Sequence, residues 1–332
     1  MTLRRRTRAM SMRRRDFIAG LIGAAVSPVT TLAQQPERIR RIGFLRVGAP
    51  PEAFIAGFRK GMREQGLFES HHFTIEYSLA QSAAEMPDAA AKLVGRNVEI
   101  IVASGTPSVL PARNAAGDIP VVFVATLDPV ATGLVGSLAR PGRNVTGMIS
   151  ISGDIIAKRL QLAKELIPNL KRIAILVRES SPTTAQYLQE SQAAARNLAI
   201  ELQILVESNP KDLERLFAEM HGSGALVIAD DAEFTAHRGQ IAELALSSRL
   251  PTVSGLREMV EAGGLMANGA SFGELYRRAA GQVTKILRGA NPATVPVEQP
   301  IKFELILNLK SARALGLQMP ANLLGQADEV IE

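Results

Sequence analysis

Short runs of β-branched and apolar residues alternate along the chain with longer segments of helical periodicity. The first run, residues 41–47, stops at Gly48-Ala49-Pro50-Pro51, after which apolar residues recur at helical spacing over residues 52–67. The same pattern then repeats. It predicts strands at 41–47, 73–79, 98–103, 121–125, 145–149, 172–177, 200–206, 225–229 and near Thr252, with helices that include 52–67, 155–166, 185–198, 213–221, 241–248 and 276–287.

This alternation of strand and helix predicts an α/β fold with parallel sheets covered by helices on both faces. The runs at 98–103 and 121–125 are continuously apolar, as expected of strands buried on both faces. Two successive strand–helix series, in a chain of 332 residues with 46% hydrophobic residues, predict two Rossmann-like lobes, each with its own core. The sequence shows no long Gly/Ser-rich or Pro-rich linker between them, so we expect short crossings.

The formal net charge of +6 suggests a nucleic-acid-binding protein, but its distribution argues against one. The first 33 residues contain seven arginines and a single acid, so they account for the whole excess. The remainder of the chain is formally neutral and lacks the positive field on which phosphate binding depends. We therefore expect no nucleic-acid partner.

The basic N-terminal segment predicts export. Arg13-Arg14-Arg15-Asp16-Phe17-Ile18 is a twin-arginine pattern, followed by a hydrophobic stretch through Val26 and by small residues at Thr31-Leu32-Ala33. The apolar stretch is shorter than the roughly 20 residues that span a bilayer. Residues 1–33 are therefore predicted to be a twin-arginine-type signal peptide, and the protein to be periplasmic.

Small polar residues and prolines follow several predicted strands. Ser104-Gly105-Thr106-Pro107, Thr126 with Asp128-Pro129, and Ser180-Ser181-Pro182 share this construction, and Asp230 follows another strand. Such sequences cap helices, and cap formation alone would explain them. At the carboxyl ends of parallel strands, however, they would also line a ligand cleft and offer N–H donors to an anion.

The patterns of a catalytic or metal site are absent from the sequence. The four histidines, His71, His72, His221 and His237, do not have metal-ligand spacing, and the chain has no cysteine, nucleophile elbow or phosphate-binding glycine loop. We expect no metal, no cofactor and no enzymatic activity. With 4% aromatic residues and no tryptophan, a sugar site is disfavoured, and an amino acid or small carboxylate fits better.

Segments spread from residue 41 to the C-terminus share the pattern of one protein family. They include Arg41-Ile42-Gly43-Phe44-Leu45, the segment from Ser137 to Gly147 (SLARPGRNVTG), Glu261-Ala262-Gly263-Gly264-Leu265-Met266 and Asp328-Glu329-Val330-Ile331. In these segments the chain resembles the ABC transporter substrate-binding family often labelled as tryptophan/tyrosine transport-system binding proteins.

The resemblance implies the type I periplasmic binding protein fold, with two lobes joined by three crossovers. The expected lobes are residues 38–147 plus 271–297 and residues 148–270 plus 298–332, with the ligand in the cleft between them. Asn268 stands where such proteins commonly have a tyrosine, which weighs against an aromatic amino acid as the ligand. The implied ligand-binding residues are Ser104, Gly105, Thr106, Thr126, Asp128, Ser180, Ser181, Asp230 and Asn268.

The resulting prediction is the periplasmic solute-binding component of an ABC importer, with permease and ATPase subunits in the inner membrane as partners. Asp128 and Asp230 would meet a ligand amine or hydroxyl, and Ser104, Thr106 and Ser181 a carboxylate. The alternative is a periplasmic receptor that reports a ligand to a membrane signalling protein.

Overall fold

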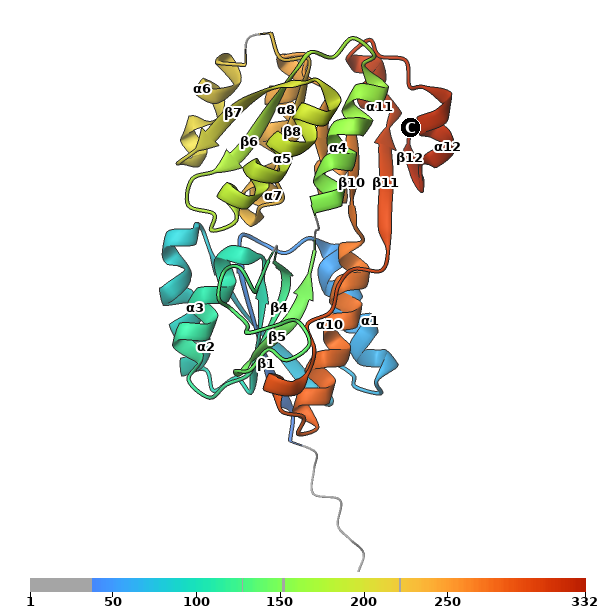
Figure 1. Ribbon diagram of the computed structural model, residues 1–332. Coiled ribbons are helices and arrows are strands. Elements are labelled where there is room, and N and C mark those ends of the chain that lie inside the picture. The colour runs from blue at the N-terminus through green and yellow to red at the C-terminus, as the bar shows by residue number, and fades with distance from the viewer. Residues whose placement is uncertain (1–37, 127, 151–152, 221) are drawn as a thin grey trace, which may run out of the picture. The chain divides into compact units, whose positions relative to one another are not determined.

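Two β-sheets organise the chain (Figure 1). The computed structural model describes residues 38–126, 128–150, 153–220 and 222–332, so the predicted signal peptide and His221 lie outside the described residues. Residues 39–332 form one compact unit. We call the five-stranded sheet and its helices the N-lobe, and the seven-stranded sheet and its helices the C-lobe.

The N-lobe sheet is entirely parallel, with strand order β2-β1-β3-β4-β5. Its inner strands are almost continuously apolar because helices cover both of its faces. The strands are β1 (Arg40–Val47), β2 (Phe73–Ala80), β3 (Ile100–Ser104), β4 (Val121–Thr126) and β5 (Val145–Ile149).

Alternate residues of β1 divide the N-lobe core between the two faces. Ile42 and Phe44 pack with α1 (Glu52–Glu64) and α10 (Phe272–Leu287). Leu45 and Val47 pack on the other side with α2 (Met86–Gly95) and α3 (Thr106–Ala116). Figure 1 shows α2 and α3 on one side of the sheet and α1 and α10 on the other, so a helix from late in the sequence completes the N-lobe.

The C-lobe sheet has the order β12-β11-β10-β9-β8-β6-β7 and is parallel except where β11 runs antiparallel to β10. The antiparallel pair departs from the all-parallel sheet that the strand–helix alternation predicts, because the helix that follows β10, α10, packs in the N-lobe, and the chain then re-enters the C-lobe sheet as β11. The strands are β6 (Arg172–Arg178), β7 (Glu201–Glu207), β8 (Ala225–Ile228), β9 (Thr252–Ser254), β10 (Met266–Ala270), β11 (Phe303–Asn308) and β12 (Glu329–Ile331).

Helices also cover both faces of the C-lobe sheet. Ile173, Ile175 and Val177 of β6 pack with α4 and α5, whereas Ala174 and Leu176 pack with α6, α8 and α9. The helices are α4 (Gly153–Leu166), α5 (Thr184–Leu198), α6 (Leu213–Ala218), α7 (Ala232–Ala236), α8 (Arg238–Ser247), α9 (Arg257–Glu261), α11 (Leu309–Ala314) and α12 (Ala321–Gln326), with single 3-10 turns at Ala83–Glu85, Pro210–Asp212 and Pro292–Thr294.

The chain crosses between the lobes three times, after β5, between β10 and α10, and before β11. Near the third crossing Met148, at the edge of the N-lobe sheet, forms a β-bridge with Glu298. The predicted fold class of two α/β lobes joined by three crossovers is therefore confirmed, while the exact residue boundaries of the lobes stay a prediction. Within the described residues, no helix is both long and apolar enough to cross a membrane.

Candidate functional site

A small cavity lies where the carboxyl ends of N-lobe strands face those of C-lobe strands. Its volume is about 30 Å³, enough for one or two water molecules. Arg46, Gly105, Thr106, Ala125 and Phe54 line it from the N-lobe. The C-lobe and the crossing to α10 contribute Asp230, Asp231, Ala232, Thr235, Leu256 and Phe272.

A second cavity of about 100 Å³ shares the Phe272 side chain as a wall. It lies beside the crossing from β10 to α10, where Ser271 and Gly273 flank this phenylalanine. Gly255 and Glu258 line it from the C-lobe, and Ala53 from α1. The two cavities therefore adjoin at the place where the chain passes between lobes.

Gly105 allows the lobes to approach each other closely. Its φ of 81° lies in the left-handed region that favours glycine, and a Cβ there would lie 3.2 Å from the Cβ of Ala232 in the C-lobe. A Cβ on Gly48, at the end of β1, would similarly lie 2.9 Å from the Cβ of Ala236. Two of the strand-to-helix loops thus contain glycine where an alanine side chain of the other lobe lies nearest.

The predicted residues Ser104, Thr106 and Thr126 have different surroundings: Ser104 and Thr126 are buried, and Thr106 is partly buried in the cavity wall. Thr106 Oγ1 lies 3.3 Å from Thr126 Oγ1, at the start of α3 and the end of β4. Ser104 is fully buried and hydrogen-bonded to the hydroxyl of Tyr276, which comes from α10. Burial raises the pKa of Tyr276 to about 12, so its phenol stays protonated and can act as a donor. Of the three, only Thr106 lines the cavity within the described part of the chain.

The last residues of β4, just before the following loop, are strained. Ala125 has a φ of 65°, uncommon for a residue with a side chain, and the register between β4 and β5 shifts at this point. The side chain of Asp128 follows in the same loop, and its Oδ1 accepts hydrogen bonds from the backbone N–H groups of Val130 and Ala131. Asp128 therefore holds the turn together, and it is absent from the cavity wall that the described residues form.

Asp230 lines the cavity but already has protein partners. Its Oδ2 accepts from Arg159 Nη2 at 2.8 Å and its Oδ1 from the backbone N–H of Gly255 at 3.1 Å. Arg159 is fully buried and also donates from Nε to the backbone carbonyl of Asn268. The Oδ1 atom of Asn268 is buried without a hydrogen-bond partner in the described structure, and Asn268 is outside both cavity linings.

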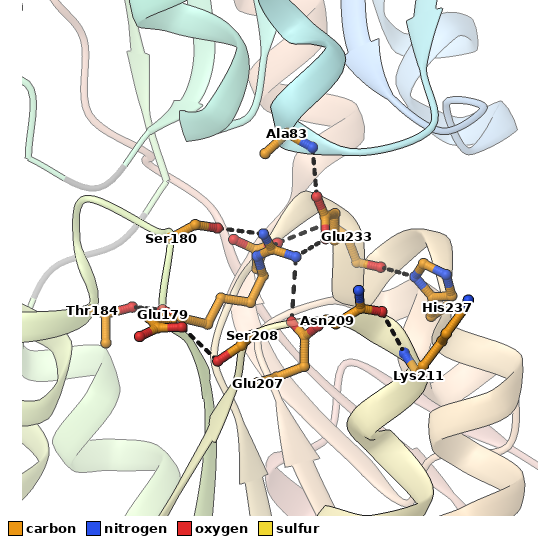
Figure 2. A network of polar contacts seen from close by, with 12 residues as sticks. Ala83, Glu179, Ser180, Thr184, Glu207, Ser208, Asn209, Lys211, Glu233 and His237 are labelled. Atoms are coloured by element: carbon orange, nitrogen blue, oxygen red, sulfur yellow. Dashed lines mark hydrogen bonds and ion pairs between the residues drawn. The ribbon is translucent and has the colours of Figure 1, made fainter.

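A second buried arginine, Arg178, ends β6 and faces three carboxylates (Figure 2). It forms ion pairs with Glu207 at 3.3 Å, with Asp231 at 3.5 Å and with Glu233. Burial raises the pKa of Asp231 to about 6 and also raises that of Glu207, while Arg178 opposes both changes. The cluster is buried and carries more acids than bases.

The predicted residues Ser180 and Ser181 belong to the surroundings of this cluster. Arg178 donates to the hydroxyl of Ser180, as Figure 2 shows, and the Ser181 hydroxyl lies 3.1 Å from that of Thr183 just before α5. Both serines lie outside the lining of the small cavity, as far as the described residues define it. Whether they contact a ligand stays a prediction.

One member of the cluster connects the two lobes. Glu233, in α7 of the C-lobe, accepts through Oε1 a hydrogen bond of 2.6 Å from the backbone N–H of Ala83 in the N-lobe (Figure 2). Its backbone carbonyl also lies 2.9 Å from His237 Nδ1. Arg178 thus positions a carboxylate that binds the opposite lobe.

Three aromatic rings form one side of the cavity region. Phe54 stacks on Tyr276 with ring centroids 4.7 Å apart and on Phe272 with centroids 5.2 Å apart. The guanidinium carbon of Arg46 lies 5.3 Å from the centre of the Phe54 ring. The residues predicted from the sequence do not include Arg46, Phe54 and Phe272. The available signal for Arg46 was an arginine directly after the apolar run of residues 42–45 in the first strand.

Sequence and structure comparisons agree on one family. The family model described as "ABC transporter substrate binding protein" matches residues 50–331. The chain belongs to this family. A similar curated protein, the "Tyrosine-binding protein" of Clostridioides difficile (strain R20291), is 27% identical over 266 residues, which cover 79% of this chain and 76% of that protein. Members are substrate-binding proteins, a family typically found outside the cytoplasm.

Solved structures establish the type I periplasmic binding protein fold for this family member. An ABC domain in complex with L-Trp from Streptococcus pneumonia and a conserved domain protein from Vibrio cholerae each have a TM-score of 0.82 and 24% identity, covering 88% of this chain and 100% of the other. The leucine-binding protein LivK of Thermotoga maritima has a TM-score of 0.55 at 14% identity, covering 77% and 84%. At these identities the likeness concerns the fold.

Proposed function

We propose that this protein is the periplasmic solute-binding component of an ABC importer, which captures an amino acid or a small or aromatic carboxylate between its lobes. The observation that carries the proposal is the cavity built from strand ends of both lobes, with an arginine, two carboxylates and two threonines in its wall. The names of two similar proteins, one tyrosine-binding and one in complex with L-Trp, support this ligand class.

Binding would work by shifting a conformational equilibrium. A cavity of about 30 Å³ holds water but not an organic acid, so a ligand enters when the lobes separate or the lining side chains move. Contacts with both lobes are complete only after closure, and binding therefore favours the closed form. A permease and an ATPase in the inner membrane would receive that form and release the ligand.

The proposal includes export and the absence of catalysis. The twin-arginine pattern within Arg13-Arg14-Arg15-Asp16-Phe17-Ile18 would direct the folded protein to the periplasm. Replacing all three of these arginines by lysine should retain the protein in the cytoplasm, whereas replacing Arg4, Arg5 and Arg6 in the same way should leave export intact. Periplasmic accumulation of the variant changed at residues 13–15 would contradict the predicted route.

A thermal-shift screen tests the binding function directly. The processed protein, residues 34–332, is first unfolded and refolded to remove any bound ligand, then screened against amino acids, aromatic acids, short carboxylates, nucleosides and sugars. A ligand that binds only the folded state raises the melting temperature. A hit among amino acids or carboxylates supports the proposal, and incubation with that hit should return it chemically unchanged. No shift with any compound would overturn it.

A further inference from the structure

Arg46 is a buried cation that the described protein groups leave largely unpaired. It is 3% exposed, at the end of β1, and its Nη1 donates to the Ser104 hydroxyl at 3.2 Å. Its Nε and Nη2 atoms are buried without a hydrogen-bond partner, and it forms no ion pair with a carboxylate among the described residues. A buried charge without a counter-charge is costly, so its presence in the cavity wall calls for an anion.

Glu258, a residue of opposite charge, is likewise buried with an atom that has no hydrogen-bond partner among the described residues. It is 4% exposed, at the start of α9 in the C-lobe, and it lines the 100 Å³ cavity that adjoins Arg46's cavity at Phe272. Its Oε2 atom is buried and has no hydrogen-bond partner among the described residues. Burial lowers the pKa of Arg46 and Glu258 opposes this change, but no ion pair joins the two side chains among the described residues. Each lines its own cavity, and Phe272 belongs to the walls of both.

The other charged groups that line the two cavities have protein partners. Arg257 forms an ion pair with Glu329, and Glu304 forms one with Lys302. Asp230 accepts from Arg159 and from a backbone N–H. Asp231 accepts from the backbone N–H of Glu233 and lies 3.5 Å from Arg178. Arg46 and Glu258 are therefore the two charged residues of the cavity walls that are left to bind the charged groups of a ligand.

We propose that Arg46 binds the carboxylate of the ligand and Glu258 its ammonium group, so that the two residues together select a zwitterion. This inference rests on the proposed function. It decides between the two ligand classes that the proposed function leaves open, an amino acid and a carboxylate without an ammonium group. A carboxylate without an ammonium would satisfy Arg46 but would stand near the carboxylates of Asp231, in the same cavity wall, and of Glu258, in the adjoining one. An α-amino acid carries both charges on neighbouring atoms, and its side chain would then meet Phe54 and Phe272.

Isothermal titration calorimetry with matched probes tests the selection. Two sets are used: L-phenylalanine, phenylpropionate and phenylethylamine, and L-leucine, isocaproate and isopentylamine. Within each set the carbon skeleton is nearly constant, and only the charges differ. We expect the amino acid of at least one set to bind about thirtyfold or more tightly than its acid and its amine.

Two charge-removing variants assign the roles. Arg46→Gln should weaken amino-acid binding about thirtyfold while leaving any affinity for the amine unchanged. Glu258→Gln should weaken amino-acid binding while improving the affinity for the acid, because a repelling charge is gone. Arg215→Gln, which changes an exposed arginine of α6, is the matched control and should bind as the wild type does. Melting temperatures identify any variant that is unfolded, and the opposite responses to acid and amine distinguish a binding role from a structural one.

The possible outcomes separate this inference from the proposed function. Tighter binding of an acid than of its amino acid, or equal responses of both variants to acid and amine, overturns the zwitterion assignment and leaves the importer proposal intact. If none of the six probes binds, the zwitterion assignment also fails. The broad ligand screen then decides independently whether the protein binds a small molecule at all.

Discussion

Replacing Arg178 by methionine should destabilise the protein strongly at neutral pH and much less in acid. Methionine approximates the volume of the arginine stem but leaves Glu207, Asp231 and Glu233 as buried carboxylates without their shared cation. Removing one partner of a buried ion pair typically costs about 3–5 kcal/mol. We expect a loss in the free energy of unfolding of that size at pH 8.

The pKa of Asp231 indicates how much free energy the burial of its ionised carboxylate costs. Burial raises it from 3.8 to about 6 even with Arg178 in place. Since each pKa unit corresponds to about 1.4 kcal/mol, the ionised Asp231 carboxylate already costs about 3 kcal/mol in the folded protein. Without Arg178, which lowers this pKa, the folded-state value must rise further.

The raised pKa of Asp231 determines how the free energy of unfolding changes with pH. A carboxyl group whose pKa is higher in the folded than in the unfolded state binds its proton more tightly when folded. Its contribution to stability is greatest below 3.8 and is lost as the pH rises through about 6. Because the variant's folded-state pKa is higher still, its deficit relative to the wild type should grow with increasing pH and shrink by pH 5.

Urea denaturation followed by circular dichroism at pH 5 and pH 8 measures both effects. Arg215→Met is the matched control, because this arginine of α6 forms an exposed ion pair with Glu219, directly after the helix, and no measurable change is expected. A deficit below about 1 kcal/mol at pH 8, or one that is equal at both pH values, would refute the reasoning. The first result would mean that the carboxylates are solvated, and the second that the loss is one of packing.

Three further predictions concern individual contacts of the site. Glu233→Ala should expose the backbone N–H of Ala83, so hydrogen exchange at Ala83 should accelerate in the variant; unchanged exchange would rule out the contact between the lobes in solution. Gly255→Ala should lower the melting temperature by several degrees, because the new Cβ would overlap the Asp230 carboxylate, whereas Gly95→Ala, at a glycine with open space and no positive φ, is the control; equal melting temperatures would contradict the packing. Thr106→Ala should weaken ligand binding about tenfold without unfolding the protein, since this threonine lines the cavity, and undiminished affinity by calorimetry would remove it from the site.

The same measurement separates Thr106 from Asp128. The Asp128 carboxylate caps the turn at Val130 and Ala131, so Asp128→Ala should lower stability more than it lowers affinity. Thr132→Ala is a suitable control for Thr106, because its hydroxyl bonds to the backbone of that turn and it lies outside the cavity wall that the described residues form. Equal losses of affinity in the Thr106 and Thr132 variants would indicate an indirect effect.

The periodic pattern of apolar residues predicted most of the framework. The strand predicted at 121–125 is β4 (Val121–Thr126), and the helix predicted at 185–198 is α5 (Thr184–Leu198). These elements can be predicted from the sequence because their own apolar side chains make the core contacts that stabilise them. The positions of polar residues after the strands were equally local information. Of the residues predicted from them, Gly105, Thr106 and Asp230 line the small cavity, and their contact with a ligand stays a prediction.

Other strands depend on neighbours rather than on their own pattern. β10 has the sequence Met-Ala-Asn-Gly-Ala, which has no strand signal, and it is extended because it pairs with β9 on one side and β11 on the other. The helix α10 likewise follows β10 in sequence but completes the core of the N-lobe. Tertiary contacts therefore decided where the late part of the chain belongs.

The partners of the charged residues also could not be predicted from the sequence. Asp230 and Asp128 look alike as acids after strands, but Asp230 is held by Arg159, 71 residues away, and Asp128 binds its own turn. Arg46 and Glu258 differ from the other buried charges only in lacking such partners. Local sequence determined which groups stand at the strand ends. Only the tertiary structure decided which of them are neutralised by the protein, because a buried charge is stabilised by whatever lies a few ångströms away in space, at any distance along the chain.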